Sequence, residues 1–573
     1  MSLHLVRLLS RVAALLVMLA AVLSPRTAAA DDGGEHEYDV VVYGGTAAGV
    51  TAAIAADRMG KSVALVCPDT HIGGMTVSGL GWTDSKNGNA VGGLSREFYH
   101  RVWQYYRDPA VWKQSTRDGY KDNGSQPGNP AMNDQQQVMW TFEPHAAEKV
   151  IDAWLDDSGV EVYRDHWLDR DSGVVVEDGT IRQIKMIDGT AFSAKVFIDA
   201  GYEGDLMAAA GVSHDIGRDA RSDYDEALNG IRFEIKGVDR YYHGDAFIGI
   251  SPYVRPGVPG SGFLPGVEGM MPEDEQLGDA DDRLQSFNFR LCLTAQPNNR
   301  VQIEKPADYD EAEYELLLRL FDAGHPSSFT DQEMPNYKTD SNNRGVVSFD
   351  YVGGNFNEDE GWNYSEASYD KRREIYEDHK RYQMGLLWTL ANNPRIPADQ
   401  RQRNGRYGLA KDEFVDNDNW PDQMYVREAR RLKGEFTMTA HHVRLNEEVP
   451  KPIGLGSYSL DSHVVRRVVV DDTIVAEGGF YEFWDKPYPI GYGSLVPRRD
   501  EMTNLLVPVT LSASHAAFGS IRMEPTYMIL GHTSGVAAAL AIDEDAAVQD
   551  LDYDALARTL REQGQLLVPS DMK

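Results

Sequence analysis

Cysteine is scarce in this sequence, whose 573 residues include only Cys67 and Cys292. This scarcity excludes the dense disulfide framework that stabilises many small exported domains. Cys67 ends an apolar segment, and Cys292 lies in the apolar run NFRLCLT. We therefore expect two buried free thiols, with a single bridge between them as the alternative.

Positive charge is also in short supply. Lys and Arg together number 56 against 89 Asp and Glu, which gives a formal net charge of −33. Such a surface repels nucleic acid and anionic lipid, so we predict no nucleic-acid partner. The apolar content of 42% and the aromatic content of 10% are those of a globular chain rather than a disordered acidic one.

The apolar run at the N-terminus is too short to span a membrane. It covers residues 12–23, whereas a bilayer requires roughly 20 residues. Arg7 and Arg11 precede this run, and Ala28 and Ala30 form an A-x-A cleavage pattern after it. Residues 1–30 therefore predict a signal peptide and a secreted or periplasmic protein with no membrane contact after cleavage; an anchored form is the alternative.

A β-α-β pattern begins the mature chain, in the sequence EYDVVVYGGTAAGVTAAIAADRMGKSVALVCPD. Residues 38–43 are apolar and β-branched, as in a buried parallel strand. Residues 47–59 predict a helix that Gly60 ends, and residues 62–66 predict a second strand. This context is the one in which a glycine-rich turn binds a dinucleotide.

The turn departs from G-x-G-x-x-G at its second glycine. Gly44 permits a tight turn and Gly49 lets the helix lie close to the sheet, but Thr46 occupies the position between them. The Thr46 hydroxyl could donate a hydrogen bond to a phosphate. Cys67 stands where an acid for the ribose is usual, and Asp69 or a backbone group could replace that acid.

Other elements follow from hydrophobic periodicity and turn signals. The predicted helices cover residues 142–159, 371–394, 425–434 and 526–542, and the predicted strands and β-meander cover residues 160–166 and 179–198. The helix at 526–542 carries Gly531, Ser534 and Gly535, which would let it approach another backbone closely. A peripheral helix is expected after about Asp543.

Four segments occur in order along nearly the whole mature chain: DVVVYGGTAAG, HIGGMTVSGLG, VFIDAGYEGDLMAAAGV and NLLVPVTLSASHAAFGSIRMEP. Together they resemble the secreted FAD-dependent oxidoreductases of the glutathione-reductase-2-like superfamily, often labelled xanthan-lyase-like. The resemblance implies an α/β fold with a Rossmann-type FAD-binding domain, a β-meander and an inserted mixed α/β cap domain. The implied boundaries are residues 31–215 and 453–573 for the FAD-binding domain and 216–452 for the substrate or cap domain.

The resemblance also implies which residues hold FAD. The pyrophosphate turn would comprise Gly44, Gly45, Thr46, Ala47, Ala48 and Gly49, with Cys67 at the ribose position. The segments beside the flavin and adenine would contribute Gly73, Gly74, Met75, Val162, Ala200 and Gly201. Near the isoalloxazine ring would lie Gly519, Ser520, Ile521 and Arg522, where a positive Arg522 would stabilise the anionic reduced flavin.

Catalysis by hydride transfer needs a base, and histidine is the commonest choice. His515 in SASHAAFGS and His463 in YSLDSHVVRR are the candidates, with Arg522 as a further catalytic residue. For each histidine the alternative is a buried imidazole that donates to a backbone carbonyl. His71 could tether FAD covalently or be a solvated loop residue.

Two charged clusters have both a functional and a structural interpretation. Arg427, Arg430 and Arg431 on the predicted helix at 425–434 could grip an anionic substrate, or Glu428 could pair with Arg431. The acidic segment DEFVDNDNWPD lacks the spacing of an EF-hand loop. We therefore predict no metal.

The sequence thus predicts an exported FAD-dependent oxidoreductase, an oxidase or dehydrogenase. Its partner would be a small-molecule substrate: a sugar, polyol, alcohol or amine. No second G-x-G-x-x-G with strand and helix occurs, so a resident NAD(P)H site is not expected. The alternatives are a binding protein whose cofactor site is impaired, motivated by Thr46 and Cys67, and a polysaccharide-modifying enzyme such as a lyase.

Overall fold

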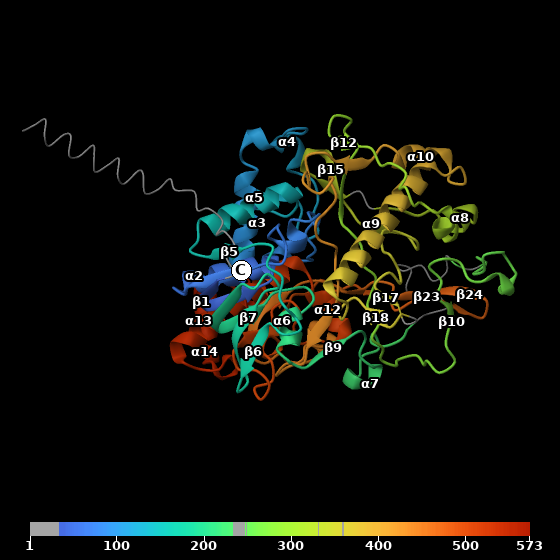
Figure 1. Ribbon diagram of the computed structural model, residues 1–573. Coiled ribbons are helices and arrows are strands. Elements are labelled where there is room, and N and C mark those ends of the chain that lie inside the picture. The colour runs from blue at the N-terminus through green and yellow to red at the C-terminus, as the bar shows by residue number, and fades with distance from the viewer. Residues whose placement is uncertain (1–33, 233–246, 248, 330–331, 358–359, 573) are drawn as a thin grey trace, which may run out of the picture.

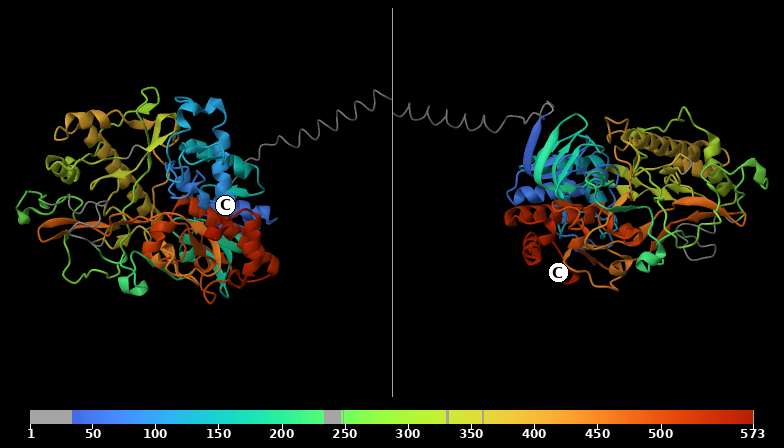
Figure 2. Two further views of the ribbon diagram at one scale, coloured as in Figure 1. Left: turned by 180° about the vertical axis from the view of Figure 1, so that it is seen from behind. Right: turned by 60° about the horizontal axis from the view of Figure 1, so that its bottom comes forward.

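The structure is a computed structural model. It describes residues 34–232, 247, 249–329, 332–357 and 360–572. The predicted signal peptide at residues 1–30 lies outside the described residues. Within the described part of the chain, no helix combines the length and the apolar character that crossing a bilayer demands. A part built on a mostly parallel sheet and a part that contains the long helix α9 lie side by side (Figures 1 and 2).

The main sheet has seven strands in the order β5-β2-β1-β8-β7-β6, with β27 paired to β8. Their bounds are β1 Glu35–Tyr43, β2 Val63–Val66, β5 Glu161–Tyr163, β6 Val174–Glu177, β7 Thr180–Lys185, β8 Ala191–Asp199 and β27 Leu505–Leu506. Strands β5, β2, β1, β8 and β27 run parallel, whereas β7 and β6 are antiparallel. The predicted Rossmann-type sheet with a β-meander is confirmed.

Helices α2 (Ala47–Arg58) and α13 (Glu524–Glu544) pack against each other at backbone distance. A Cβ added to Gly531 would collide with the carbonyl oxygen of Ala48. Any larger residue at that position would therefore push the two helices apart. The predicted C-terminal helix is present, and its small residues serve the close approach that was predicted for them.

The remaining α-helices surround the sheet and build the cap. They are α3 Gly93–Tyr105, α4 Arg117–Tyr120, α5 Pro144–Asp156, α6 Asp205–Ala209, α7 Arg221–Tyr224, α8 Glu315–Asp322, α9 Tyr369–Asn392, α10 Ala398–Asn404, α11 Ala440–Val443, α12 His515–Ile521 and α14 Tyr553–Glu562. Helix α9 corresponds to the predicted helix at 371–394, and α5 to that at 142–159. Figure 1 shows α9 running along the cap part.

The cap contains an antiparallel sheet in the order β12-β19-β11-β15-β14 and a smaller mixed sheet in the order β10-β23-β24, in which β10 and β23 are parallel and β23 and β24 antiparallel. The bounds are β10 Gly269–Met270, β11 Leu291–Thr294, β12 Arg300–Val301, β14 Gln332–Met334, β15 Lys338–Ser341, β19 Gly408–Ala410, β23 Arg466–Val470 and β24 Thr473–Glu477. The boundaries at residues 215 and 452 stay a prediction. Strand β10 pairs with β23, so the middle and last parts of the chain share a sheet.

Short strand pairs complete the fold. They are β3 Met132–Asn133 with β4 Val138–Met139, β9 His214–Ile216 with β20 Arg430–Leu432, β13 Ser328–Phe329 with β16 Asn343–Arg344, β17 Phe356–Asn357 with β18 Trp362–Asn363, β21 Pro452–Gly456 with β26 Tyr488–Gly491, and β22 Leu460–Ser462 with β25 Phe480–Glu482.

The segment YVREARRLKG is not a helix, so that prediction was wrong. Its end forms β20, antiparallel to β9, and Arg427, Arg430 and Arg431 are 1%, 4% and 1% exposed. Buried guanidinium groups require carboxylate partners, and these lie on several different elements, so tertiary ion pairs override local helix propensity. The pair of Glu428 with Arg431 is present all the same.

Both cysteines are buried and free, as predicted. Cys67 directly follows β2 and Cys292 lies within β11. Burial raises the pKa of both thiols, which keeps them protonated and unreactive.

Candidate functional site

The turn between β1 and α2 depends on two glycines. Gly44 has a φ of 107°, and a Cβ there would lie 2.5 Å from the backbone nitrogen of Gly201. A Cβ on Gly49 would collide with the carbonyl oxygen of Gly44. The first glycine thus brings β1 against the end of β8, and the second brings α2 against the turn.

Thr46 is the N-cap of α2. Its hydroxyl oxygen accepts a hydrogen bond from the backbone N–H of Gly49 at 3.2 Å and donates one to the carbonyl of Ala200 at 2.8 Å. The hydroxyl proton is therefore used within the protein, contrary to the expectation that it meets a phosphate. The threonine fixes the helix N-terminus to β8 and leaves anion binding to backbone N–H groups.

Cys67 lies beneath the turn. Its side chain is fully buried, and a Cβ on Gly45 would collide with its sulfur atom. Asp69, two residues later, is exposed to a cavity, and its carboxylate makes no hydrogen bond or ion pair with the described residues. Burial on its other sides raises the pKa of Asp69 to about 7, and the charges of Glu203 and Asp422 add to this. Asp69 is thus an acid that could accept a hydrogen bond from a ribose hydroxyl group.

This cavity, which we name the edge pocket, has a volume of about 510 Å³. It lies where β1, β2 and β8 end, which is where open parallel sheets bind their ligands. Gly44, Gly74 and Gly201 line it, and the nearest atom to a Cβ added at Gly201 would be 3.4 Å away. The backbone is therefore open to close approach by a ligand, which fits the adenosine and pyrophosphate half of FAD.

The other residues that the sequence analysis assigned to FAD do not line the edge pocket. The residues buried beneath it or beside it are Gly45, Thr46, Ala47, Ala48, Gly49, Cys67, Gly73, Met75 and Ala200. Val162 lies half-buried in β5, next to β2. Gly519, Ser520 and Ile521 are buried in α12, where Ser520 donates to the carbonyl of Tyr458 at 2.7 Å.

Part of the cap side of the edge pocket comes from helix α9, which was not connected with the site from the sequence. The lining residues of this helix are Tyr369, Arg372, Arg373, Tyr376 and Glu377. Their spacing of i, i+3, i+4, i+7 and i+8 places them on one helical face. This spacing of aromatic and charged residues is the sequence signal that could have identified the pocket-lining face of α9.

Asp205 at the start of α6 joins this helix to the sheet. Arg372 binds its carboxylate with two nitrogens at 2.6 and 2.9 Å, and Arg430 and Arg170 contact it at 2.9 and 3.2 Å. Burial alone would raise the pKa of Asp205, but Arg372 and the other two guanidinium groups hold it well below its usual range. The ion pairs therefore fix α9 over the ends of the strands.

His71 also lines the edge pocket. Its Nδ1 lies 2.5 Å from Glu148, and its Nε2 lies 3.0 Å from Asp416. The hydrogen bond to Glu148 raises the pKa of His71 to about 9 despite its partial burial. A protonated imidazole has no free lone pair, so this pairing favours the non-covalent alternative over attachment of FAD through His71.

His515, the first candidate base, is buried at the start of α12. Its Nδ1 lies 2.8 Å from Glu428, and its Nε2 has no hydrogen-bond partner among the described residues. Burial would raise the pKa of Glu428, but its interactions with His515 and Arg431 lower it to about 2. Glu428 is therefore ionised and holds the imidazole in one orientation.

His463 and Arg522 belong to the same buried network. The Nδ1 of His463 lies 2.6 Å from Asp350, and its Nε2 lies 3.6 Å from Asp461. Arg522 contacts Asp461 at 3.2 Å. Gln285 connects the two histidines, because it donates to Glu428 at 2.9 Å and accepts from the backbone N–H of His463 at 3.1 Å.

The network lies next to the edge pocket. Gln423 and Met424 line the pocket, Tyr425 then accepts a hydrogen bond from Arg522 at 2.8 Å, and Glu428 holds His515. The three predicted catalytic residues, although distant in the sequence, are thus brought together by one extended segment that begins at the pocket wall.

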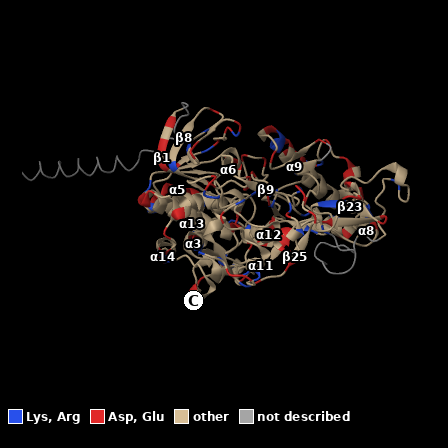
Figure 3. Cartoon of the chain, turned by 90° about the horizontal axis from the view of Figure 1, so that it is seen from below, with Lys and Arg blue, Asp and Glu red and all other residues tan. Residues whose placement is uncertain are grey.

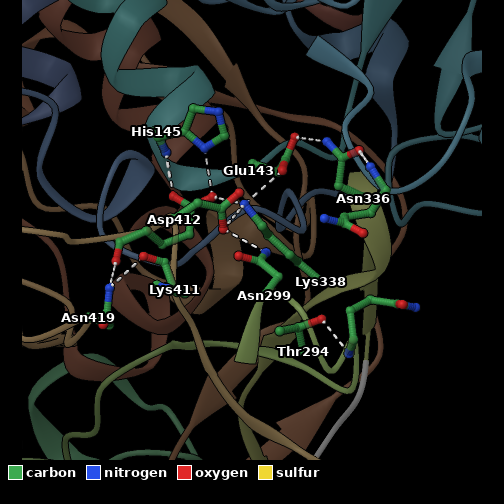
Figure 4. Close-up of polar contacts among 12 residues, drawn as sticks. Glu143, His145, Thr294, Asn299, Asn336, Lys338, Lys411, Asp412 and Asn419 are labelled. Carbon is green, nitrogen blue, oxygen red and sulfur yellow. Dashed lines mark hydrogen bonds and ion pairs between the residues drawn. The ribbon is translucent and has the colours of Figure 1, made fainter. Parts of the chain in front are cut away.

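A further polar cluster surrounds Lys338, which is fully buried (Figure 4). Glu143, His145 and Glu413 could each offer a ligand atom to a metal, and these atoms lie within 4.8 Å of one another. The Lys338 ammonium group, however, lies 2.8 Å from Glu143 and 2.5 Å from Glu413. A lysine is thus the counter-ion of both carboxylates. That no metal binds stays a prediction.

About a third of the chain is similar to solved structures at low identity. OxyS anhydrotetracycline hydroxylase from Streptomyces rimosus is 11% identical, with 32% of this chain and 36% of that one covered and a TM-score of 0.23. L-proline dehydrogenase from P. horikoshii is 15% identical, with 33% and 59% covered and a TM-score of 0.23. L-amino acid deaminase from Proteus vulgaris is 16% identical, with 33% and 53% covered and a TM-score of 0.23. This chain thus spans less than two thirds of each.

No curated protein matches the chain. A family model described as "FAD dependent oxidoreductase" matches residues 39–560, which include the β1–α2 turn, the edge pocket and the buried histidine network. The cofactor is therefore FAD, and the chain belongs to the family of FAD-dependent oxidoreductases.

Proposed function

We propose that this protein is an exported flavoenzyme that oxidises a small organic substrate, a sugar, polyol, alcohol or amine, with His515 as the base. Bound FAD supplies the acceptor for a hydride. The protein must then take the proton that leaves the substrate hydroxyl or amine, and a neutral imidazole nitrogen does this well near neutral pH.

One observation carries the proposal: a buried carboxylate holds one nitrogen of His515, and the other nitrogen is left without a partner. With Glu428 ionised, the proton of the imidazole sits on Nδ1, and the lone pair of Nε2 is the acceptor. This is the base-and-orienter arrangement that catalytic histidines use. Glu428 is itself held by Arg431 and Gln285.

Two other buried histidines provide the contrast. His379 also has an unpartnered Nε2, but its Nδ1 donates to the carbonyl of Ile375 in its own helix, and burial lowers its pKa to about 4. That is the ordinary structural arrangement. His463 has acidic neighbours at both nitrogens. The comparison supports His515 as the base and His463 as a residue that positions the network.

Export rests on residues 1–30, which have the pattern of a signal peptide. The closer resemblance to the group labelled xanthan-lyase-like rests on the four sequence segments. Neither the substrate class nor the destination follows from the family itself.

The first test is the visible spectrum of the purified mature protein. An oxidised flavin gives absorption bands at about 370 and about 450 nm, and we expect about one FAD per chain. A colourless protein that cannot be reconstituted with FAD would refute the proposal. Anaerobic bleaching by a panel of sugars, polyols, alcohols and amines then identifies the substrate class.

The second test replaces the base. His515→Ala should lower the rate of flavin reduction roughly 10²- to 10⁴-fold, while the flavin content stays unchanged. His379→Gln is the matched control, because it alters a buried histidine with the same unpartnered nitrogen but no carboxylate. Equal rates of reduction in wild type and His515→Ala would show that the base is another group.

A further inference from the structure

One buried arginine differs from all the others that the structure describes. Arg467 in β23 is 5% exposed and has no carboxylate within ion-pair distance among the described residues. Every other buried arginine of the described chain has one: Arg218, Arg283, Arg290, Arg372, Arg427, Arg430, Arg431, Arg466 and Arg522. The contrast is clearest with its neighbour Arg466, which pairs with Glu275 and Glu477.

The contacts of Arg467 satisfy it only in part. One terminal nitrogen donates to the carbonyl of Val346 at 3.0 Å, the other reaches the carbonyl of Gly266 at 3.4 Å, and Nε has no partner. Burial lowers the pKa of Arg467, and the nearby Tyr382 and Asp350 offset this effect only in part. A buried charge without a partner is unfavourable. In a chain with 89 acidic residues, the absence of a partner is a specific feature of this position.

Arg467 lines a cavity of about 440 Å³, which we name the cap pocket. The guanidinium group of Arg283 also lines it, lies over the ring of Phe356 at 4.4 Å, and binds Glu268 at 3.0 Å. Tyr351 forms another part of the wall. In Figure 3, β23 stands out in blue, the colour of Lys and Arg.

These groups define the chemistry of a ligand. A guanidinium group binds carboxylates and phosphates through paired N–H groups, so the missing partner of Arg467 is an oxoanion. The aromatic walls suit a planar or apolar group attached to that anion. Glu268 is already engaged by Arg283, so it does not neutralise Arg467.

We propose that the cap pocket binds a small organic anion, whose carboxylate or phosphate group Arg467 holds and whose planar or apolar part lies against Phe356 and Tyr351. This site is separate from the edge pocket, because the two cavities share no lining residue. The cap pocket nevertheless adjoins the buried histidine network, because Tyr351 lines the cap pocket while the adjacent Asp350 holds His463. The proposal does not depend on the reaction at the flavin.

The test is isothermal titration calorimetry of the mature protein with its bound flavin. Benzoate and phenyl phosphate are the two probes, and neutral benzamide is the control, all at one ionic strength. We expect one or both anions to bind and benzamide not to bind. Binding of only one anion identifies the class of the natural ligand. Failure of both anions to bind would overturn the proposal.

Arg467→Met keeps the length of the side chain and removes its charge. We expect it to weaken binding of the anion roughly ten- to hundredfold, the effect of losing hydrogen bonds to a charged group. Arg558→Met, on the exposed face of α14, changes the net charge equally and should leave binding unchanged. Should Arg467→Met fold poorly, Arg467→Lys keeps the charge but loses the paired donors and should still weaken binding. Wild-type affinity in a folded Arg467 variant would overturn the proposal.

Discussion

The edge pocket and the cap pocket each contain a charged side chain that makes no ion pair with the described residues, and the two charges differ in sign. Asp69 in the edge pocket is an acid without a cationic partner, and Arg467 in the cap pocket is a cation without an acidic partner. Among the described residues many other buried charges are paired, as Asp205 is by three arginines.

The difference in sign indicates different ligand groups. An acid at the end of a parallel strand accepts hydrogen bonds from ribose hydroxyl groups, while the negative pyrophosphate is held by backbone N–H groups of the turn. A lone guanidinium group instead binds an oxoanion directly. The sign of an unpaired charge in a cavity therefore indicates which group of a ligand it binds.

The largest effect should come from Gly44→Val. Its side chain would collide with the backbone of Ala200 and Gly201, at a φ of 107° that a β-branched residue rarely adopts. We expect purified Gly44→Val to contain no flavin by absorbance. Because the cap pocket shares no residue with the turn, binding of benzoate or phenyl phosphate should persist. Normal flavin content in this variant would contradict the proposed position of the pyrophosphate.

The second prediction compares a paired arginine with the unpaired one. Arg427→Met leaves the buried Asp350 without its guanidinium partner, which should cost about 3–5 kcal/mol of stability. Arg467→Met leaves no carboxylate without its partner, so we expect the free energy of unfolding to fall by less than about 1 kcal/mol or to rise. Thermal unfolding midpoints of the two variants check this. An equal loss in both would mean that Arg467 stabilises the fold as the paired arginines do.

Much of the sheet and the cofactor turn was predictable because local sequence determines them. The apolar run before Gly44, the alanine-rich helix after it and the small residues of α13 each require a close-packed neighbour. The segment around Arg430 was not predictable in the same way. Its conformation depends on carboxylates such as Asp205 and Asp350, which come from distant parts of the chain.

The site shows the same division. Thr46 was recognised as a variant of the turn, but only the structure reveals that its hydroxyl bonds to Ala200. The sequence analysis considered Asp69 as a substitute for an acid at Cys67, while the orientation of Cys67 towards Gly45 depends on packing. The partner of His515 could not be inferred, since Glu428 was placed on a helix that does not form.

The third prediction sharpens the role of the acid. Asp69→Asn keeps the size of the side chain but removes the charge that accepts the ribose hydrogen bond. We expect FAD affinity to fall roughly tenfold, the difference between a charged and a neutral hydrogen bond. Cys67→Ser is the control: it faces Gly45 rather than the pocket, so any loss should appear in stability rather than affinity. Fluorescence titration of the apoprotein with FAD measures the affinity of each variant. An unaltered affinity in Asp69→Asn would assign the ribose to another group.

The smallest effect should be the pH dependence of FAD binding. When no ligand is bound, burial raises the pKa of Asp69 to about 7, and the charges of Glu203 and Asp422 add to this effect. Ribose hydroxyl groups donate more strongly to the ionised carboxylate, so binding of FAD should lower this pKa and release a proton. Affinity should therefore rise as the pH increases through about 7 and level off above it.

Because Asp69 is open to solvent in the pocket, which screens its charge, we expect a rise of only about two- to fivefold between about pH 6 and about pH 8. Asp69→Asn should abolish this rise, whereas Arg467→Met should retain it, and a slope of the opposite sign in the wild type would mean that FAD binds the protonated acid.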